Sequence, residues 1–488
     1  MTQRKTSATV DRVVAQTPRR SATKEIAHLS AAEHRARGKA ARKDVPRTSH
    51  GAWEAFAGRP DPVDLLEEQA TARVPELVPI RYGRMLVSPF TFYRGGAYIM
   101  ASDLAHTPVS GLNVQLCGDA HLSNFGGFAS AERRMVFDIN DFDETLPGPW
   151  EWDVKRMAAS FEIAGRDRGF SEKQRREAVA SAVRFYREAM VSFAAMRDMD
   201  VWYASLDVEA HLTEIEKTVG AKRSAAVKRN LAKAHTKDST KALGKLTHLV
   251  DGTPKILSDP PLVVPITELF SEVEAKEVEG RIRRILRNYR ATLQNDRRVL
   301  VEHFRFADLA RKVVGVGSVG TRAFIVLMLG RDDQDPLFLQ VKEASSSVLE
   351  SFVGASAFKN HGQRVVEGQR LMQASSDIFL GWIRVAGIDG VERDFYVRQL
   401  WDWKASAEID TFTPKMLATY GHMCGWTLAR AHARSGDRQA IAAYLGSSAT
   451  YDEAIADFSA AYADQNEADY AAFKAAVEDG RLKAETGF

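Results

Sequence analysis

Cysteine, long apolar runs and net charge are all scarce in this chain of 488 residues. The two cysteines, Cys117 and Cys424, cannot form the disulfide framework of a small secreted domain. No uncharged apolar run approaches the roughly 18 residues that span a bilayer, and the basic start lacks the apolar segment of a signal peptide. We therefore expect a cytoplasmic protein without membrane contact.

The charge is nearly balanced, because 67 Lys and Arg residues face 64 Asp and Glu residues. The net charge of +3 creates no whole-protein field that would attract nucleic acid, so we do not expect a nucleic-acid partner. Hydrophobic residues make up 45% and charged residues 27%, which is ordinary globular usage and argues against a largely disordered chain. The length suits about three domain-sized units or one large two-lobed core.

Two segments depart from this balance. Residues 1–47 hold twelve Lys and Arg against four Asp and Glu, and their weak periodicity predicts a flexible basic arm. Such an arm is either a solvated tail or a docking segment for an acidic partner. Residues 217–245 hold nine basic residues and one acid at helical spacing, which indicates an exposed helix face or, as the alternative, a phosphate or nucleic-acid contact.

The hydrophobic pattern changes several times along the chain. Short apolar runs separated by turn signals fill residues 78–116. Helical periodicity dominates from Asp153 to about residue 300, and a capping box at Ser171 opens one long amphipathic helix. Two Val/Ile/Leu-rich strands flank a turn within 312–344, and helices return after Asp410. This pattern predicts an α+β protein.

The clearest concentration of polar residues follows a short strand-like run. A loop aspartate, Asp119, is followed five residues later by Asn124, and the next strand-like run ends at Asp141 and Asp143. One carboxylate can orient or deprotonate an attacking hydroxyl, while an amide oxygen and further carboxylates suit magnesium. We therefore predict phosphoryl-transfer chemistry with Asp119 as a catalytic residue and Asn124, Asp141 and Asp143 as metal ligands. A glycosidase would need only the paired carboxylates and would leave Asn124 without a role.

A glycine-rich string forms the second candidate cluster, with Gly315, Gly317, Ser318 and Gly320. Such a string is weak by itself, because it occurs in dinucleotide-binding folds as well as in kinase phosphate loops. A dinucleotide fingerprint opens a helix, whereas the residues after Gly320 are strand-like and turn back into a strand that carries Lys342. We predict that the glycine-rich turn covers nucleotide phosphates and that Lys342 pairs with them.

Lys342 needs an acidic partner to hold it in place. The helix expected at about 357–373 offers Glu367, whereas Glu343 points to the opposite face of the strand because side chains alternate there. We therefore predict Glu367 as the partner and count both Lys342 and Glu367 among the catalytic residues. The strand at 395–400 is either the contact for adenine or an ordinary buried strand.

Several long strings resemble the bacterial family called domain of unknown function 2252, over about residues 45 to 470. The strings that carry this resemblance are Phe92-Tyr93-Arg94-Gly95, Cys117-Gly118-Asp119-Ala120-His121-Leu122-Ser123-Asn124-Phe125-Gly126, Asn140-Asp141-Phe142-Asp143-Glu144 and Gly148-Pro149-Trp150-Glu151-Trp152-Asp153. This resemblance implies a shared fold and no particular activity.

Two of these strings also resemble elements of aminoglycoside and choline phosphotransferases, which belong to the protein-kinase-like superfamily. That resemblance implies ATP and Mg²⁺ as cofactors, Asp119 as the catalytic base, and Asn124 and Asp141 as metal ligands. It also implies that Asp153 braces the catalytic loop from a helix. One position departs from the pattern, because Cys117 stands where those enzymes have their first His.

The candidate elements occur in an unusual order. Asp119 and Asp141 precede Gly315 and Lys342 by about 170 to 220 residues, whereas kinases have the glycine-rich loop and the lysine first. A circular permutation accounts for this order, with the helix expected at 413–435 in the position that leads into the catalytic loop.

We therefore predict a circularly permuted, protein-kinase-like α+β fold in four segments. These are the basic flexible arm (1–47), a first part of the helical lobe with the catalytic and metal-binding loops (48–300), a β-rich nucleotide-binding lobe (301–405) and C-terminal helices that complete the helical lobe (406–488). The predicted function is ATP- and Mg²⁺-dependent phosphoryl transfer to a hydroxyl of a small molecule or protein. AMP transfer by the same site and a non-catalytic nucleotide-binding scaffold are the alternatives.

Overall fold

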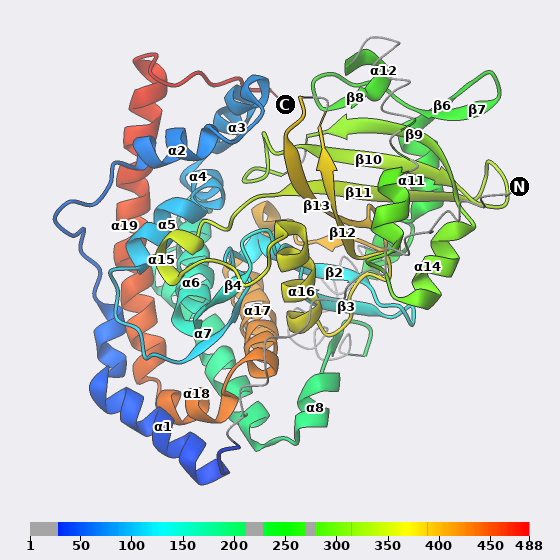
Figure 1. Ribbon diagram of the computed structural model, residues 1–488. Helices are drawn as coiled ribbons and strands as arrows, with labels where there is room; N and C mark the ends of the chain where they lie inside the picture. The colour runs from blue at the N-terminus through cyan, green and yellow to red at the C-terminus, as the bar shows by residue number, and fades with distance from the viewer. Residues whose placement is uncertain are drawn as a thin grey trace, which may run out of the picture.

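A computed structural model describes residues 28–210, 228–229, 231–269, 280, 282, 284–313, 315–387 and 389–487. The architecture is mixed α+β, with one six-stranded sheet, three smaller sheets and many helices in the described ranges. The large sheet lies on one side of the molecule and most long helices lie on the other (Figure 1). The long helix α19 (Thr450–Glu478) runs along the outer edge of the helical side.

Six antiparallel strands form the large sheet. In order across the sheet they are β12 (Gly381–Ala386), β13 (Glu392–Gln399), β11 (Pro336–Ala344), β10 (Ala323–Leu329), β9 (Arg305–Lys312) and β8 (Val263–Pro265). The central strand β10 is apolar throughout because both of its faces are covered: Ile325 and Leu327 face one core, and Val326 and Met328 face another. The two predicted strands within 312–344 are confirmed as β10 and β11.

The lobe built on this sheet begins earlier in the chain than residue 301. Helix α11 (Ser239–Leu246) packs on one face through Leu243, and Leu286 and Tyr289 pack on the other face. The described residues between 239 and 300 therefore belong with the sheet and not with the helical lobe. Their helical periodicity identifies an apolar face correctly but carries no information about which lobe that face covers. The remaining elements of this lobe are β6 (Thr247–Val250), β7 (Thr253–Ile256), α12 (Ile266–Leu269), α14 (Asn295–Glu302) and α16 (His361–Met372).

The helical part is centred on α6 (Trp150–Asp167), which is buried from Trp150 to Gly165. Helix α7 (Glu172–Ala195) opens with the predicted capping box at Ser171, and α17 (Pro414–Ser435) packs along it with Thr413 as its N-cap. The other helices here are α2 (Pro62–Ala70), α3 (Val78–Met85), α4 (Pro89–Gly95), α5 (Ala97–Leu104), α8 (Asp198–Tyr203), α15 (Glu350–Val353), α18 (Arg438–Leu445) and α19. None of the helices in the described ranges has an apolar stretch long enough to cross a bilayer.

Two small sheets hold the loops between the two parts. Strand β1 (Asn113–Leu116) pairs with β4 (Leu146–Pro149). The hairpin of β2 (Phe125–Ala129) and β3 (Met135–Ile139) is flanked by β14 (Ala405–Ser406) and β5 (Leu206–Asp207). In Figure 1 this hairpin lies below the large sheet and to the right of α17.

The first described helix, α1 (Ala31–Asp44), packs against α18. Ser30 and Glu33 form a capping box at its start. A Cβ atom on Gly38 would lie 2.0 Å from the carbonyl oxygen of Ala440, so only glycine permits this close approach. The predicted basic arm is thus a docked helix over 31–44, which differs from the expected flexibility, and residues 1–27 lie outside the described residues. Residues 217–227 of the second basic stretch also lie outside them.

Candidate functional site

The loop between β1 and β2 carries Asp119. Gly118 has a φ angle of +84°, and a Cβ atom there would lie 2.4 Å from the carbonyl oxygen of Glu144, so this turn requires glycine. The side-chain nitrogen of Asn124 donates to the Asp119 carbonyl at 2.7 Å. This hydrogen bond fixes the loop and leaves the amide oxygen of Asn124 as the remaining polar atom of that side chain.

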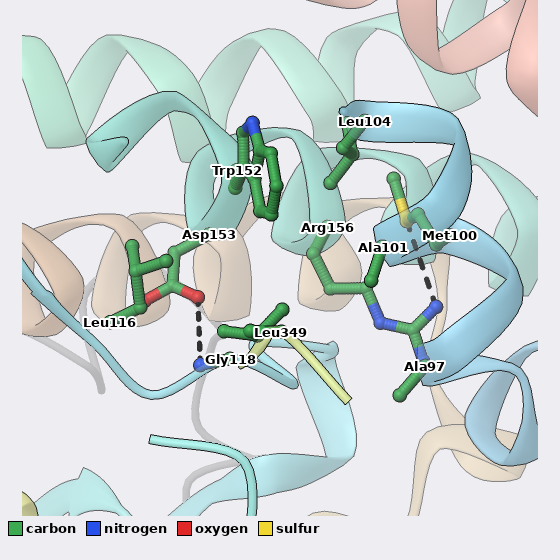
Figure 2. A pocket seen from close by; sticks show the side chains of 10 residues that line it. All are labelled: Ala97, Met100, Ala101, Leu104, Leu116, Gly118, Trp152, Asp153, Arg156 and Leu349. Atoms are coloured by element: carbon green, nitrogen blue, oxygen red, sulfur yellow. Dashed lines mark hydrogen bonds between the residues drawn. The ribbon is translucent and has the colours of Figure 1, made fainter. Parts of the chain in front are cut away.

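Helix α6 braces this loop through Asp153. The buried carboxylate accepts the backbone N–H groups of Cys117 at 2.8 Å and of Gly118 at 3.0 Å, and the second of these bonds is visible in Figure 2. From α17, Nε2 of His432 lies 3.2 Å from the same carboxylate. Cys117 therefore contributes its backbone N–H to this brace, and the imidazole beside Asp153 comes from His432.

A second α6 residue, Arg156, holds the carboxylate of Asp119. Its Nε and Nη2 lie 2.9 and 2.8 Å from Oδ1 of Asp119, and Nη2 also donates to the Tyr93 carbonyl at 2.8 Å. Oδ2 of Asp119 lies 3.6 Å from Nε2 of His121. Burial, and after it the charges of Arg94 and Arg156, lower the pKa of His121 well below its usual value, so this imidazole is neutral near pH 7. Asp119 thus has one oxygen committed to Arg156 and one that faces a neutral ring.

A small cavity lies beside the braced side of this loop. Figure 2 shows Asp153, Arg156 and Gly118 at its wall. The rest of the lining is apolar and comes from Ala97, Met100, Ala101, Leu104, Leu116, Trp152 and Leu349. Because Asp119 is not part of this lining, we do not assign the cavity to a substrate.

Strand β3 delivers two more carboxylates to the end of the Asp119 loop. The backbone N–H of Asn140 donates to the carbonyl of Asn124 at 2.8 Å, which places Asp141 directly after this junction. From β11 of the large sheet, Nζ of Lys342 lies 2.6 Å from Oδ2 of Asp143 and 3.7 Å from Oδ2 of Asp141. The predicted lysine and the predicted acidic pair therefore meet across the two parts of the molecule.

The three charged groups shift one another. Burial acts to lower the pKa of Lys342, but Asp141 and Asp143 together raise it above its usual value. The ammonium of Lys342 outweighs burial at Asp143 and lowers the pKa of that carboxyl, which also accepts the Tyr396 hydroxyl at 2.7 Å. Burial and the neighbouring Asp143 charge raise the pKa of Asp141. Asp143 is thus engaged by Lys342 and Tyr396, whereas Asp141 lies 3.7 Å from Lys342 and is the carboxylate with more capacity for another cation.

Glu367 is not the partner of Lys342 in this structure. It lies on α16, the helix expected there, but its carboxylate contacts Arg370 at 3.4 Å. The same helix instead contributes buried Arg364, which donates to the backbone carbonyl of Asp143 at 2.8 Å. The physical reason is that Asp143 approaches the lysine directly from across the interface, so α16 supports the backbone of the acidic loop and does not supply the acid.

The glycine-rich turn reaches the same carboxylates. It connects β9 to β10, and Gly315 and Gly320 have φ angles of +70° and +90°, which favour glycine. The hydroxyl of Ser318 donates to Oδ2 of Asp143 at 3.3 Å. The hairpin arrangement predicted for Gly315, Gly317, Ser318 and Gly320 is confirmed, and its tip lies beside Lys342 and Asp143.

The oxygen donors at this junction fit the chemistry of magnesium. Within the described part of the chain, no group of three or more His, Cys, Asp and Glu side chains is arranged to hold a metal ion. Magnesium, however, is usually bound through one or two carboxylates together with water and substrate phosphates. Asp141 and Asn124 meet that requirement better than Asp143, because Asp143 is already paired with Lys342 and Tyr396.

Two residues of the site were not identified from the sequence. Arg156 lies three residues after Asp153, a spacing that places both on one helix face, so the periodicity of α6 contained that signal. Tyr396 lies directly opposite Lys342 in the register of β11 and β13, and the sequence does not specify that register. The strand at 395–400 thus contributes a hydroxyl to the acidic pair, in addition to any contact with a base.

A family model described as "Uncharacterized protein conserved in bacteria (DUF2252)" matches residues 73–476. The chain belongs to this family. No curated protein and no solved structure matches it. The DUF2252 region contains the large sheet, the Asp119 loop, the Asp141 loop and α17, and it excludes α1. Every residue of the candidate site therefore lies within the family's own region.

Proposed function

We propose that this DUF2252 protein is a circularly permuted, kinase-like enzyme that transfers the γ-phosphoryl group of ATP to a hydroxyl. The observation that carries the proposal is the contact of Lys342 with Asp143 at 2.6 Å, between residues 199 positions apart in the chain. This contact joins two segments. One is β11, the strand with Lys342 that comes after the glycine-rich turn, and the other is the loop with Asp141 and Asp143 that comes after the Asp119 loop. These are the parts that position and neutralise a nucleotide's phosphates in phosphoryl transfer.

The order of elements in the large sheet supports this proposal. The glycine-rich turn between β9 and β10 comes first, β11 with Lys342 follows, and then come α16 and the pair β12 and β13. Kinases place a glycine-rich loop, a strand lysine and a helix in the same sequence. The departure lies in α16, which supplies Arg364 to the acidic loop where a kinase helix supplies a glutamate to the lysine.

The position of α17 supports the permutation. The backbone N–H of Gln115 on β1 donates to Oγ of Ser435, the last residue of α17, at 3.1 Å. The C-terminal end of α17 therefore lies against the strand that leads into the Asp119 loop. In an unpermuted kinase this helix precedes the catalytic loop in the chain. Here α17 follows the Asp119 loop in sequence, but its C-terminal end still lies beside the strand that leads into that loop.

In the proposed reaction, Asp119 orients and deprotonates the acceptor. Oδ2 is the oxygen available to an acceptor hydroxyl, because Arg156 binds Oδ1. The hydroxyl oxygen bonds to the γ-phosphorus, the bond from that phosphorus to the β–γ bridging oxygen breaks, ADP leaves, and the hydroxyl proton passes to Oδ2. Arg156 holds this carboxylate throughout, and the side-chain amide of Asn124 holds the backbone carbonyl of Asp119.

Lys342, Asp141 and Asn124 would hold the phosphate end of the nucleotide. Lys342 is the buried cation that binds the phosphates, and the turn at 315–320 covers them with backbone N–H groups. Mg²⁺, when bound through Asp141 and Asn124, supplies neutralisation of the phosphate charge. Asp143 keeps Lys342 directed toward this space.

Turnover of ATP in site variants tests the proposal. We expect Asp119→Asn and Asp141→Ala to lower Mg²⁺-dependent ADP formation by about a hundredfold or more. The matched control is Asp333→Asn, an exposed aspartate on the turn between β10 and β11, which should turn over like the wild type. Far-ultraviolet circular dichroism verifies that each variant is folded. Wild-type turnover in both site variants would refute the assignment.

The mass of the modified acceptor separates the alternatives. A candidate acceptor that gains one phosphate supports phosphoryl transfer, whereas one that gains the heavier AMP group supports nucleotidyl transfer from the same site. ATP binding without any change in mass across an acceptor set, together with no ADP formation, would favour the nucleotide-binding scaffold.

A further inference from the structure

Arg94, at the end of α4, is a partly buried arginine without a counter-ion among the described residues. Its Nε atom is buried and has no hydrogen-bond partner among the described residues. In the same ranges, no carboxylate forms an ion pair with its guanidinium. Partial burial weakens the hydration of this charge, so a guanidinium without a counter-ion is a suitable position for an anion.

The backbone around Arg94 connects the two loops of the candidate site. A Cβ atom on Gly317, in the glycine-rich turn, would lie 3.3 Å from the carbonyl oxygen of Arg94. The preceding carbonyl, that of Tyr93, accepts from Arg156 at 2.8 Å, and Arg156 holds Asp119. Arg94 therefore lies between the turn assigned to phosphates and the carboxylate assigned to the acceptor.

The charges that face Arg94 leave its guanidinium short of negative partners. Burial lowers its pKa, and among the described residues the carboxylates of Asp119 and Asp410 act against this without forming an ion pair with it. Asp119 is already bound to Arg156. His121, whose pKa the charge of Arg94 helps to lower, is neutral near pH 7 and has a buried Nδ1 atom without a partner among the residues described. An arginine keeps its proton in all these surroundings, so the charge remains to be balanced.

Three further arginines add positive charge on the same side. Arg73 and Arg84 donate to backbone carbonyls of the glycine-rich turn, and Arg81, fully buried on α3, donates to the Gly95 carbonyl and the Gln69 side chain. All of these acceptors are neutral, so none balances a charge. The region from α3 to the glycine-rich turn is therefore a concentration of cations that an anion would stabilise.

We propose that Arg94 is the centre of a subsite for a phosphate group, between the glycine-rich turn and Asp119. The phosphate has two sources, the γ-phosphate of ATP or a phosphate on the acceptor. Its assignment to one of them rests on the proposed function, whereas the anion subsite itself does not.

Calorimetric titration of the full chain tests this subsite. Inorganic phosphate, ADP and ATP, the nucleotides with Mg²⁺, are titrated at constant ionic strength into wild type, Arg94→Gln, Arg94→Lys and Arg197→Gln. Arg197 is an exposed arginine of the helical part, paired with Asp200, and serves as the matched control. We expect Arg94→Gln to weaken phosphate binding by about tenfold or more, because a hydrogen-bonded charge pair is lost. Arg94→Lys keeps the charge but not the forked geometry, so an intermediate loss is expected even if Arg94→Gln fails to fold.

The nucleotide titrations separate the sources. If ATP weakens in Arg94→Gln while ADP does not, the subsite takes the γ-phosphate. If ATP and ADP are both unaffected while phosphate weakens, it takes the acceptor's phosphate. Phosphate that binds through Arg94 in a wild-type protein that binds neither nucleotide would refute the proposed function and support the subsite. Phosphate that does not bind the wild type, or binds all four proteins equally, would overturn the subsite.

Discussion

Replacement of Asp153 by Asn perturbs the brace between α6 and the Asp119 loop. The carboxylate accepts two backbone N–H groups, at 2.8 and 3.0 Å, and its side chain is 1% exposed, so water cannot substitute for it. Asparagine offers one acceptor oxygen and an NH2 group that can only donate, so one of these backbone N–H groups loses its partner. A lost hydrogen bond to a charged group costs about 1.5–3 kcal/mol. We therefore expect the free energy of unfolding to fall by about 3 kcal/mol.

Urea unfolding, followed by circular dichroism, measures this loss. If the free energy of unfolding falls by about 3 kcal/mol per molar urea, the urea midpoint should fall by about 1 M. Asp333→Asn removes an aspartate whose side chain is 41% exposed and should leave the stability within about 0.5 kcal/mol of wild type. A midpoint for Asp153→Asn that equals the wild-type midpoint would refute the brace, because two buried N–H groups cannot both be satisfied by one amide oxygen in an unchanged geometry.

Three other perturbations test the packing and the charges. Burial lowers the pKa of Lys155 to about 7, and its Nζ has no hydrogen-bond partner among the described residues. Its penalty on folding therefore grows as the pH falls from the unfolded pKa of about 10.4 toward 7 and is constant below that. Lys155→Met should raise the urea midpoint at pH 7 and change it little near pH 10; no gain at pH 7 would contradict this. Gly38→Ala places a Cβ atom 2.0 Å from the Ala440 oxygen and should lower the free energy of unfolding by about 1–3 kcal/mol. Because alanine by itself favours a helix, a variant that is more stable than the wild type would contradict the close packing of α1 on α18. A double-mutant cycle of Lys342→Met and Asp143→Asn should give a coupling of at least about 1 kcal/mol in urea unfolding, and additive effects would argue that their ion pair is absent in solution.

Local sequence signals were sufficient for many elements. Ser171 with Gln174, and Thr413 before Pro414, marked the starts of α7 and α17, because capping depends on side chains only three residues apart. The short helices α3 and α4 were less evident, because Pro79 and Pro89 resemble turn signals although proline is well placed in the first turn of a helix. The boundary of the sheet lobe depended on tertiary packing and was misplaced.

The candidate site also combines contacts that local sequence predicts with contacts that depend on tertiary packing. Asp119, Asn124 and Asp141 follow one another within a short stretch, so their proximity was predictable from the sequence. The partner of Lys342 was not, because Asp143 reaches it across the interface between two parts of the chain, and helical periodicity favoured Glu367. Contacts of this kind depend on how the sheet docks on the helices, which no local pattern records.

The most direct test of the central claim is nucleotide binding at the junction of Lys342 and Asp141. The melting temperature of the wild type and of Asp141→Ala is measured with ATP, with Mg²⁺ and with both. We predict a rise in the wild type that requires both ligands, since a ligand that binds the folded state stabilises it, and no such rise in the variant. A wild type that shows no rise up to millimolar ATP with Mg²⁺, or a variant that rises equally, would contradict the account.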